Sequence, residues 1–170
     1  MKQTIELLIL VLSVGIMASC MDNGIDEPPR TEADELAELK VYLDTLENRG
    51  LDIDTTALGV YYVVDTEGTG PFPVNGDTCI VKYDGFFMSG YLFDSSSINN
   101  PTDSTYQFNL NAPPMIEGWD DGMKVINEGA LVFLIIPSEF AYGSSGRYPA
   151  IGPYKTLIFK IEMIDIKQAY

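Results

Sequence analysis

The segment PPMIEGWDDGMKVINEG, residues 113–129, contains the chain's only tryptophan, Trp119. Its proline pair ends the preceding element, and the acidic residues that follow are favourable at a helix N-terminus. We therefore expect a short helix that begins near Ile116 and stops by Gly129. Its apolar residues recur at helical spacing on one face: Ile116, Trp119, Met123 and Ile126. This helix lays an indole ring against the rest of the fold.

The sequence after Gly59 has the apolar pattern of β-strands. Five segments alternate or are continuously apolar, and the dipeptides Asn75-Gly76 and Ser89-Gly90 mark turns. These segments are GVYYVVD (59–65), DTCIVKYDGFF (77–87), YQFNL (106–110), ALVFLII (130–136) and TLIFKIEMI (156–164). We predict an α+β fold, a curved antiparallel sheet of about five strands wrapped on the one short helix. Such a sheet forms a concavity lined by aromatic side chains that point inward.

An extra N-terminal helix is predicted between Thr31 and Gly50. Thr31 is the candidate N-cap, Asp34 follows three residues later, and Gly50 is the stop. Its leucines form a stripe: Leu36, Leu39, Leu43 and Leu46. The stripe either packs on the chain's own domain or forms a dimerisation seam. Because the segment spans barely two heptads, we favour packing on the domain and expect a monomer.

The first twenty residues, MKQTIELLILVLSVGIMASC, have the pattern of a secretory signal. The apolar run from Leu7 to Met17 is too short for a comfortable membrane span. Its small residues before Cys20 resemble the lipobox of bacterial lipoproteins, in which that cysteine is lipidated and becomes the mature N-terminus. We expect a signal peptide over 1–19, a lipidated tether over 20–30 and attachment to the bilayer of the bacterial cell envelope, at the outer membrane. A plain secreted protein is the alternative.

Composition excludes several kinds of function. The net charge of −15, from 10 basic and 25 acidic residues, would repel phosphate backbones, so we expect no nucleic-acid partner. Histidine is absent, which removes the commonest general base and the commonest metal ligand. We expect neither a metal nor a cofactor. Any chemistry must therefore proceed without imidazole.

Cys79 and the polar segment 94–104 each allow two interpretations. Cys79 lies in an apolar alternating segment and is interpreted as a buried strand residue, with a reactive thiol as the alternative. The segment DSSSINNPTDS, residues 94–104, is interpreted as a solvated loop. Its oxygens are an alternative set of calcium ligands, although the segment lacks the spacing of an EF-hand.

Five blocks of sequence together resemble the FKBP-type peptidyl-prolyl isomerases in order and spacing. They are VKYDG (81–85), FDSS (93–96), MIEGWDDG (115–122), IPSEFAYG (136–143) and TLIFKIEMI (156–164), with Gly76-Asp77 ahead of them. The resemblance covers residues 59–170 and implies an isomerase domain there, preceded by the helix and a linker over 31–58. The implied activity is cofactor-free acceleration of Xaa-Pro bond rotation, here in polypeptides that fold outside the cytoplasm.

The resemblance also implies a pocket for the proline ring of the substrate. Trp119 is its floor, and Asp94 and Tyr142 are the polar groups at its rim. Catalytic roles are implied for Tyr83, Phe93, Asp94, Ile116, Trp119, Tyr142 and Phe159, and substrate-binding roles for Tyr106, Met115 and Ile151. Any one of these aromatic residues alone would more often be a core residue. The whole set on one concave face favours a pocket.

A pocket of this kind lowers the barrier without covalent chemistry. Rotation about an Xaa-Pro bond faces ~18–20 kcal/mol because resonance gives the C–N bond double-bond character. The twisted transition state has lost that resonance and carries less charge separation, so an apolar pocket favours it over the planar amide. The backbone N–H of Ile116, at the helix start, can hold the substrate carbonyl. We interpret Asp94 as an organiser of neighbouring side chains and not as a proton carrier.

Residues 144–155, SSGRYPAIGPYK, depart from the family pattern at Arg147, Pro149, Ala150 and Gly152. This loop overhangs the pocket, so substrate preference and affinity for the family's macrolide inhibitors stay open. Two other functions stay open as well. One is a proline-segment binding or chaperone-like module that turns over poorly, and the other is an interaction protein that works through its acidic N-terminal helix.

Overall fold

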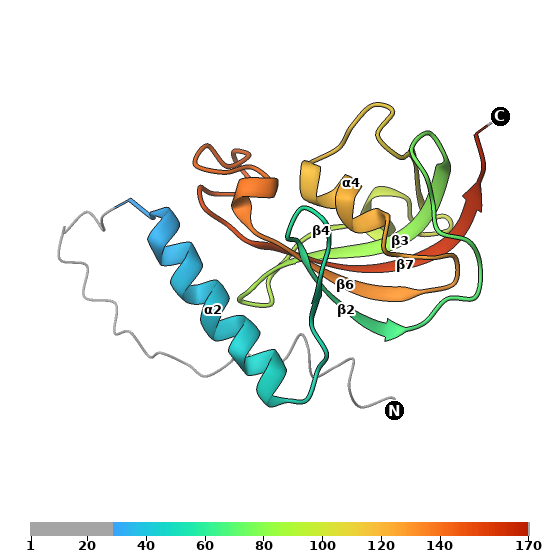
Figure 1. Cartoon of the computed structure of the whole chain (residues 1–170). Helices are drawn as coiled ribbons and strands as arrows, with labels where there is room; N and C mark the ends of the chain where they lie inside the picture. Colours follow the sequence, from blue (N-terminus) through green and yellow to red (C-terminus); the bar gives the residue numbers. More distant parts are fainter. Residues whose placement is uncertain (1–28, 170) are drawn as a thin grey trace.

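The computed structural model describes residues 29–169 (Figure 1). The predicted signal peptide, Cys20 and the tether up to residue 28 lie outside the described residues. Among residues 29–169, no helix combines the length and the apolar character that a membrane span requires. The elements follow in the order α2 (Glu32–Asn48), β1 (Asp54–Thr55), β2 (Tyr61–Thr66), β3 (Thr78–Phe87), β4 (Leu92–Ser95), α3 (Ser96–Asn99), β5 (Tyr106–Asn109), α4 (Glu117–Met123), β6 (Leu131–Ile136), the 3₁₀ turn η2 (Ser138–Phe140) and β7 (Leu157–Lys167).

The strands form one antiparallel sheet in the order β1-β2-β6-β7-β3-β4, and β5 pairs with β3. The predicted α+β fold is confirmed, and the five predicted strands are β2, β3, β5, β6 and β7. The short strands β1 and β4 were not predicted. β4 has the sequence LFDS, whose two polar residues hide the alternation that identifies a strand.

Both faces of the sheet are covered, which explains why β6 is apolar throughout. Val132, Leu134 and Ile136 point into the core that contains α4, whereas Phe133 and Ile135 point into a second core that contains α2. Successive strand residues face opposite sides, so a strand buried on both sides loses its polar half. Figure 1 shows α4 and α2 on different sides of the sheet.

The helix α2 packs on its own sheet, as predicted, through a face that includes most of the leucine stripe. Its capping box is present, because Thr31 and Asp34 exchange hydrogen bonds between side chain and backbone. The predicted leucine stripe is confirmed at Leu39, Leu43 and Leu46, which pack in the same core, but not at Leu36, which is 52% exposed. The fully buried residues are Glu35, Leu39, Tyr42 and Leu46. Glu35 and Tyr42 are therefore buried on this face, and Leu36 is not.

The helix α4 is shorter than predicted. It ends at Met123 with Lys124 as its C-cap, and Ile126 is buried beyond the helix in a turn whose bonds span three residues. Gly129 is therefore not the helix stop; its φ of 87° turns the chain toward β6. Gly118 and Gly122 face β6, where a Cβ atom on either would collide with the side chain of Ile136 or Leu134. The two glycines let the helix axis lie close to the sheet.

The two polar features with open interpretations are both ordered. Cys79 is fully buried, as predicted, and forms no disulfide within residues 29–169; burial raises the pKa of its thiol to about 11. Residues 94–104 are not simply a solvated loop, because they contain the end of β4, the turn α3 and the buried Ser96. Within residues 29–169, no group of three or more acidic or cysteine side chains is placed to hold a metal ion.

Candidate active site

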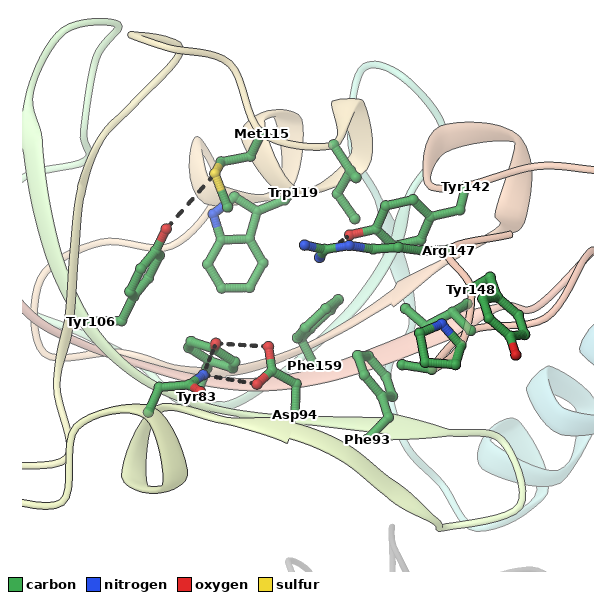
Figure 2. Close-up of a pocket in the computed structure, with 15 residues that line it drawn as sticks. Tyr83, Phe93, Asp94, Tyr106, Met115, Trp119, Tyr142, Arg147, Tyr148 and Phe159 are labelled. Carbon is green, nitrogen blue, oxygen red and sulfur yellow. Dashed lines mark hydrogen bonds between the residues drawn. The ribbon is translucent and has the colours of Figure 1, made fainter. Parts of the chain in front are cut away.

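A cavity of about 650 Å³ opens on the concave side of the sheet beneath α4 (Figure 2). All ten predicted site residues line this cavity, although their roles in a reaction stay predictions. They come from β3, β4, β5, β7, α4 and the loops after β5 and η2. Five further residues line the cavity and were not assigned to it from the sequence: Asn99, Arg147, Tyr148, Pro149 and Ala150.

Trp119 forms the floor, and aromatic rings fix its position from several sides. The indole is 4% exposed. Its ring packs edge-on against Phe159 at 5.0 Å and Tyr83 at 5.5 Å between centroids. T-shaped pairs at this spacing add to the stabilisation that burial alone provides. The buried indole Nε1–H has no acceptor among the described residues, so it is a donor on the floor of the cavity.

The entry to α4 determines how this floor is presented. Ile116 is the N-cap in an extended conformation, with no side-chain cap. The buried carboxylate of Asp120 accepts the Met115 backbone N–H at 2.7 Å and so ties the entry segment to the helix. The Ile116 backbone N–H makes no hydrogen bond with any of residues 29–169. It is one of the unsatisfied donors of a helix start, and Ile116 lines the cavity.

Gly85 of the VKYDG block makes room for the aromatic wall. It pairs with Asp94 in the β3–β4 ladder, beneath the rings of Phe93 and Phe159. A Cβ atom on Gly85 would lie 2.8 Å from Phe93 Cζ and 3.0 Å from Phe159 Cε1. The two rings meet edge-on at 5.6 Å between centroids. Any larger residue at this position would push the wall into the cavity.

Asp94 accepts three hydrogen bonds at the edge of the cavity. Tyr83 Oη donates to Oδ2 at 2.9 Å, and Oδ1 accepts Asn99 Nδ2 at 2.8 Å and the Ser95 backbone N–H at 2.9 Å. Burial, with the adjacent Asp94 carboxylate, raises the pKa of the Tyr83 hydroxyl, which therefore stays protonated and donates. A carboxylate that accepts three hydrogen bonds holds its neighbours in place. This is the arrangement expected of an organiser.

Asn99 could not have been assigned from sequence. The single turn α3, capped by the Ser95 hydroxyl, brings its amide back to Tyr83 and Asp94. A four-residue helix of sequence SSIN has no apolar periodicity from which to predict it. The other four residues belong to the loop that was expected to overhang the pocket. Their place in that loop is the sequence feature from which they could have been assigned to the cavity.

The loop after η2 forms the far rim of the cavity. Arg147 and Ile151 are bridged by two backbone hydrogen bonds of 2.7 and 2.9 Å, and the Ile151 side chain is buried. Arg147 Nη1 donates to Tyr142 Oη at 3.1 Å, and its guanidinium carbon lies 5.7 Å from the centre of that ring. The hydroxyl of Tyr142 accepts this bond, which leaves its own hydrogen available to a ligand. Tyr148 is 94% exposed at the outer edge.

Comparisons with known proteins agree with this site. The family model for FKBP-type peptidyl-prolyl cis-trans isomerases matches residues 70–164. Over 117 residues the chain is 38% identical to the FKBP-type peptidyl-prolyl cis-trans isomerase FkpA of Escherichia coli (strain K12), which covers 69% of this chain and 41% of that protein. Over 121 residues it is 35% identical to the probable FkpA of Neisseria meningitidis serogroup B, covering 71% and 43%. The chain therefore spans about two fifths of the length of these curated relatives.

Solved structures show the same fold. The crystal structure of FkpA from Escherichia coli superposes with a TM-score of 0.69 at 35% identity, covering 82% of this chain and 62% of that one. A peptidyl-prolyl cis-trans isomerase from Pseudomonas syringae pv. tomato superposes with a TM-score of 0.68 at 32% identity, covering 85% and 100%. Sequence, fold and cavity thus agree, and the chain belongs to the family of FKBP-type peptidyl-prolyl cis-trans isomerases.

Proposed function

We propose that this protein accelerates cis-trans isomerisation of Xaa-Pro bonds in polypeptides by a non-covalent mechanism. The observation that carries the proposal is the aromatic cavity floored by Trp119, with a free backbone donor at Ile116 on its margin. A proline ring is apolar and rigid, and it fits a floor of indole between aromatic walls. No histidine or cysteine lines the cavity, so neither an imidazole nor a thiol is offered to the substrate.

In this mechanism the protein favours the twisted amide over the planar one. The apolar walls disfavour the charge-separated planar form, because they replace water that would stabilise it. The N–H of Ile116 and the hydroxyl of Tyr142, at the margin of the cavity, donate to the substrate carbonyls and fix the orientation of the substrate. Asp94 and Tyr83 keep the wall in place and transfer no proton.

The rim favours an apolar residue before the proline. Tyr83, Tyr106 and Ile151 present ring and aliphatic surface toward that position, and Tyr83 and Tyr106 pack edge-on at 5.7 Å between centroids. We expect a Leu-Pro substrate to be isomerised faster than a Glu-Pro substrate. A hydrophobic preference of this kind is worth about 1–3 kcal/mol.

A protease-coupled assay on Xaa-Pro peptides tests the proposal. The uncatalysed reaction takes tens to hundreds of seconds, so even modest acceleration is visible. We expect acceleration in proportion to protein concentration and a higher kcat/KM for Leu-Pro than for Glu-Pro. A folded protein that binds these peptides without accelerating their isomerisation would overturn the proposal.

That outcome would support the second candidate, a proline-segment binding or chaperone-like module. The contact between Arg147 and Tyr142 is the observation in its favour, because it engages the rim hydroxyl and places a cation beside the cavity. Arg147→Ala separates the two candidates. If the protein is an enzyme, losing the Arg147–Tyr142 contact should change kcat/KM little. If the protein is a binding module whose turnover this contact restrains, the variant should isomerise substrate faster than the wild type.

We also propose that the protein acts outside the cytoplasm, attached to the outer membrane through lipid on Cys20. The support is the signal-like run that ends in Ala-Ser-Cys, followed by a polar, acidic and proline-bearing segment up to Arg30. Cys20→Ser is expected to release the protein into the soluble fraction. If this variant still sediments with membranes after a high-salt wash, the lipid anchor is wrong.

A further inference from the structure

Glu35 on α2 is a buried carboxylate that the isomerase mechanism does not use. It is 2% exposed. Its Oε1 accepts the Ser138 backbone N–H at 2.7 Å and the Thr156 hydroxyl at 2.7 Å, and its Oε2 accepts the Ser138 hydroxyl. Ser138 and Thr156 are themselves 3% and 1% exposed. The carboxylate therefore has three donors and no access to solvent.

These donors lie at the two stems of the loop that forms the far rim of the cavity. We call residues 139–155 the flap; Ser138 immediately precedes it and Thr156 immediately follows it. The flap carries Tyr142, Arg147 and Ile151 into the cavity. Glu35 thus holds the two ends of the flap together from the helix on the other face of the sheet.

A second contact from the same end of α2 reaches the flap. Arg30 Nε donates to the backbone carbonyl of Tyr154 at 2.8 Å, while its two Nη atoms each donate to Glu38 at 2.7 Å. The Tyr154 N–H in turn donates to the Gly143 carbonyl at 2.9 Å and closes the base of the flap. The amino end of α2 therefore contacts both stems and the closing bridge.

Docking of α2 does not by itself require a carboxylate at this position. Leu39, Tyr42 and Leu46 already bury the helix against the sheet. A buried charge costs desolvation energy, and an apolar residue of similar size often serves stability as well or better. What a fully hydrogen-bonded buried carboxylate adds is a single fixed arrangement of its partners. Those partners are the flap stems.

We propose that Glu35 is a positioning residue for the proposed isomerase, fixing the flap over the cavity through Ser138 and Thr156. This proposal rests on the proposed function. It gives Glu35, on a helix that precedes the family-matched residues 70–164, a role in substrate binding. Trp119, Phe159 and Asp94 lie on other elements, so loosening the flap weakens substrate binding more than turnover.

The test compares Glu35→Ala with Leu39→Ala, which loosens the same helix without touching the flap. Glu35→Gln is the conservative variant: its carbonyl oxygen can accept both bonds of Oε1, and its amide can donate to the Ser138 hydroxyl. For each variant we would measure kcat and KM for a Leu-Pro peptide and the hydrogen exchange of the flap amides. All measurements are made well below the melting temperature of the variant.

For Glu35→Ala we expect KM to rise at least fivefold, kcat to stay within twofold, and exchange of the flap amides to quicken. Glu35→Gln should restore KM to within twofold of the wild type. Leu39→Ala, at a similar loss of melting temperature, should leave KM and flap exchange near wild type. Equal effects of Glu35→Ala and Leu39→Ala would overturn the proposal.

Two further arms keep the test decisive. If Glu35→Ala does not fold, Thr156→Val removes one of the three donors with little change of shape, and a smaller effect in the same direction is expected; no change in flap exchange would count against the proposal.

If the wild type binds proline peptides without accelerating isomerisation, the proposed function fails. Flap exchange and the peptide dissociation constant then still decide whether Glu35 positions the flap.

Discussion

Phe93 and Asp94 are neighbours on β4 that serve the cavity in different ways. Phe93 forms part of the aromatic wall of the cavity, and its ring packs on Phe159 and on Phe87, at 5.6 and 4.9 Å between centroids. Asp94 is an acceptor whose neighbours can rearrange, because the Tyr83 hydroxyl can accept a bond as well as donate one. Loss of shape therefore matters more here than loss of charge.

We predict that Phe93→Ala lowers kcat/KM at least tenfold, which corresponds to about 1.4 kcal/mol of transition-state stabilisation. Asp94→Asn should cost less than tenfold, since the amide preserves the wall. Tyr91→Ala, which removes a ring that is 68% exposed and outside the cavity, is the control and should leave the rate within twofold. A larger loss in Asp94→Asn than in Phe93→Ala would make Asp94 a direct participant.

The hydrogen bonds of Asp77 make the folding stability depend on pH. Its carboxylate is 3% exposed and accepts the backbone N–H groups of Val74 and Ala169, each at 2.9 Å. These bonds lower the pKa of Asp77 below its ordinary value. A lowered folded-state pKa means that the stabilisation is present above the unfolded pKa, about 3.9, and is lost as pH falls through the folded value.

Asp77→Asn should therefore lower the free energy of unfolding at pH 7, and the difference from wild type should shrink on acidification below about pH 4. Urea denaturation at pH 7 and at about pH 3 measures both values. A difference that is equal at the two pH values would show that the carboxylate charge is not what stabilises this turn.

At the scale of elements, α4 depends on glycines that a helix would normally disfavour. In an exposed helix, Gly→Ala stabilises by roughly 0.5–1 kcal/mol. At Gly122 the sign should reverse, because the added methyl group meets the Leu134 side chain. We predict that Gly122→Ala lowers the free energy of unfolding by about 1–3 kcal/mol. Gly152→Ala, with no heavy atom within 4 Å of the new Cβ, is the control and should have little effect in the same urea titration.

Elements with a strong period could be predicted from the sequence, and short or polar elements could not. The five strands and the capping box of α2 follow from alternation and from Thr31 with Asp34. β4 and α3 could not be found, because four residues are too few to display a period. The ten cavity residues listed in advance came from the family resemblance, which included Phe93 and Asp94 although their strand β4 was not predicted; Asn99 on α3 was not among them.

The orientation of α2 was predictable only in part. Leucine content indicates a face, but the observed face includes Glu35, which is buried because its three donors lie on other elements. Those donors are more than a hundred positions away in the chain. A pattern read within one helix contains no information about such partners.

At the scale of the whole molecule, the sheet separates a cavity face from a face closed by α2. Leu39, Tyr42 and Leu46 cover Phe133, Ile135 and Ile158. Each buried side chain of this kind stabilises by about 1.5–3 kcal/mol. We predict that deleting residues 21–50 lowers the melting temperature and that the full chain is a monomer in light scattering. A full-length dimer that dissociates on this deletion would instead support a dimerisation seam.

In the proposed mechanism the cavity accelerates Xaa-Pro rotation by shape and low polarity, without proton transfer. NMR exchange spectroscopy on a Leu-Pro peptide, with the purified chain at pH 6, 7 and 8, tests it most directly. Histidine is absent, and reference pKa values of carboxylate, phenol and guanidinium groups lie outside this range. We expect acceleration that is constant within about twofold across these pH values. Binding without acceleration, or a rate that changes tenfold per pH unit, would contradict it.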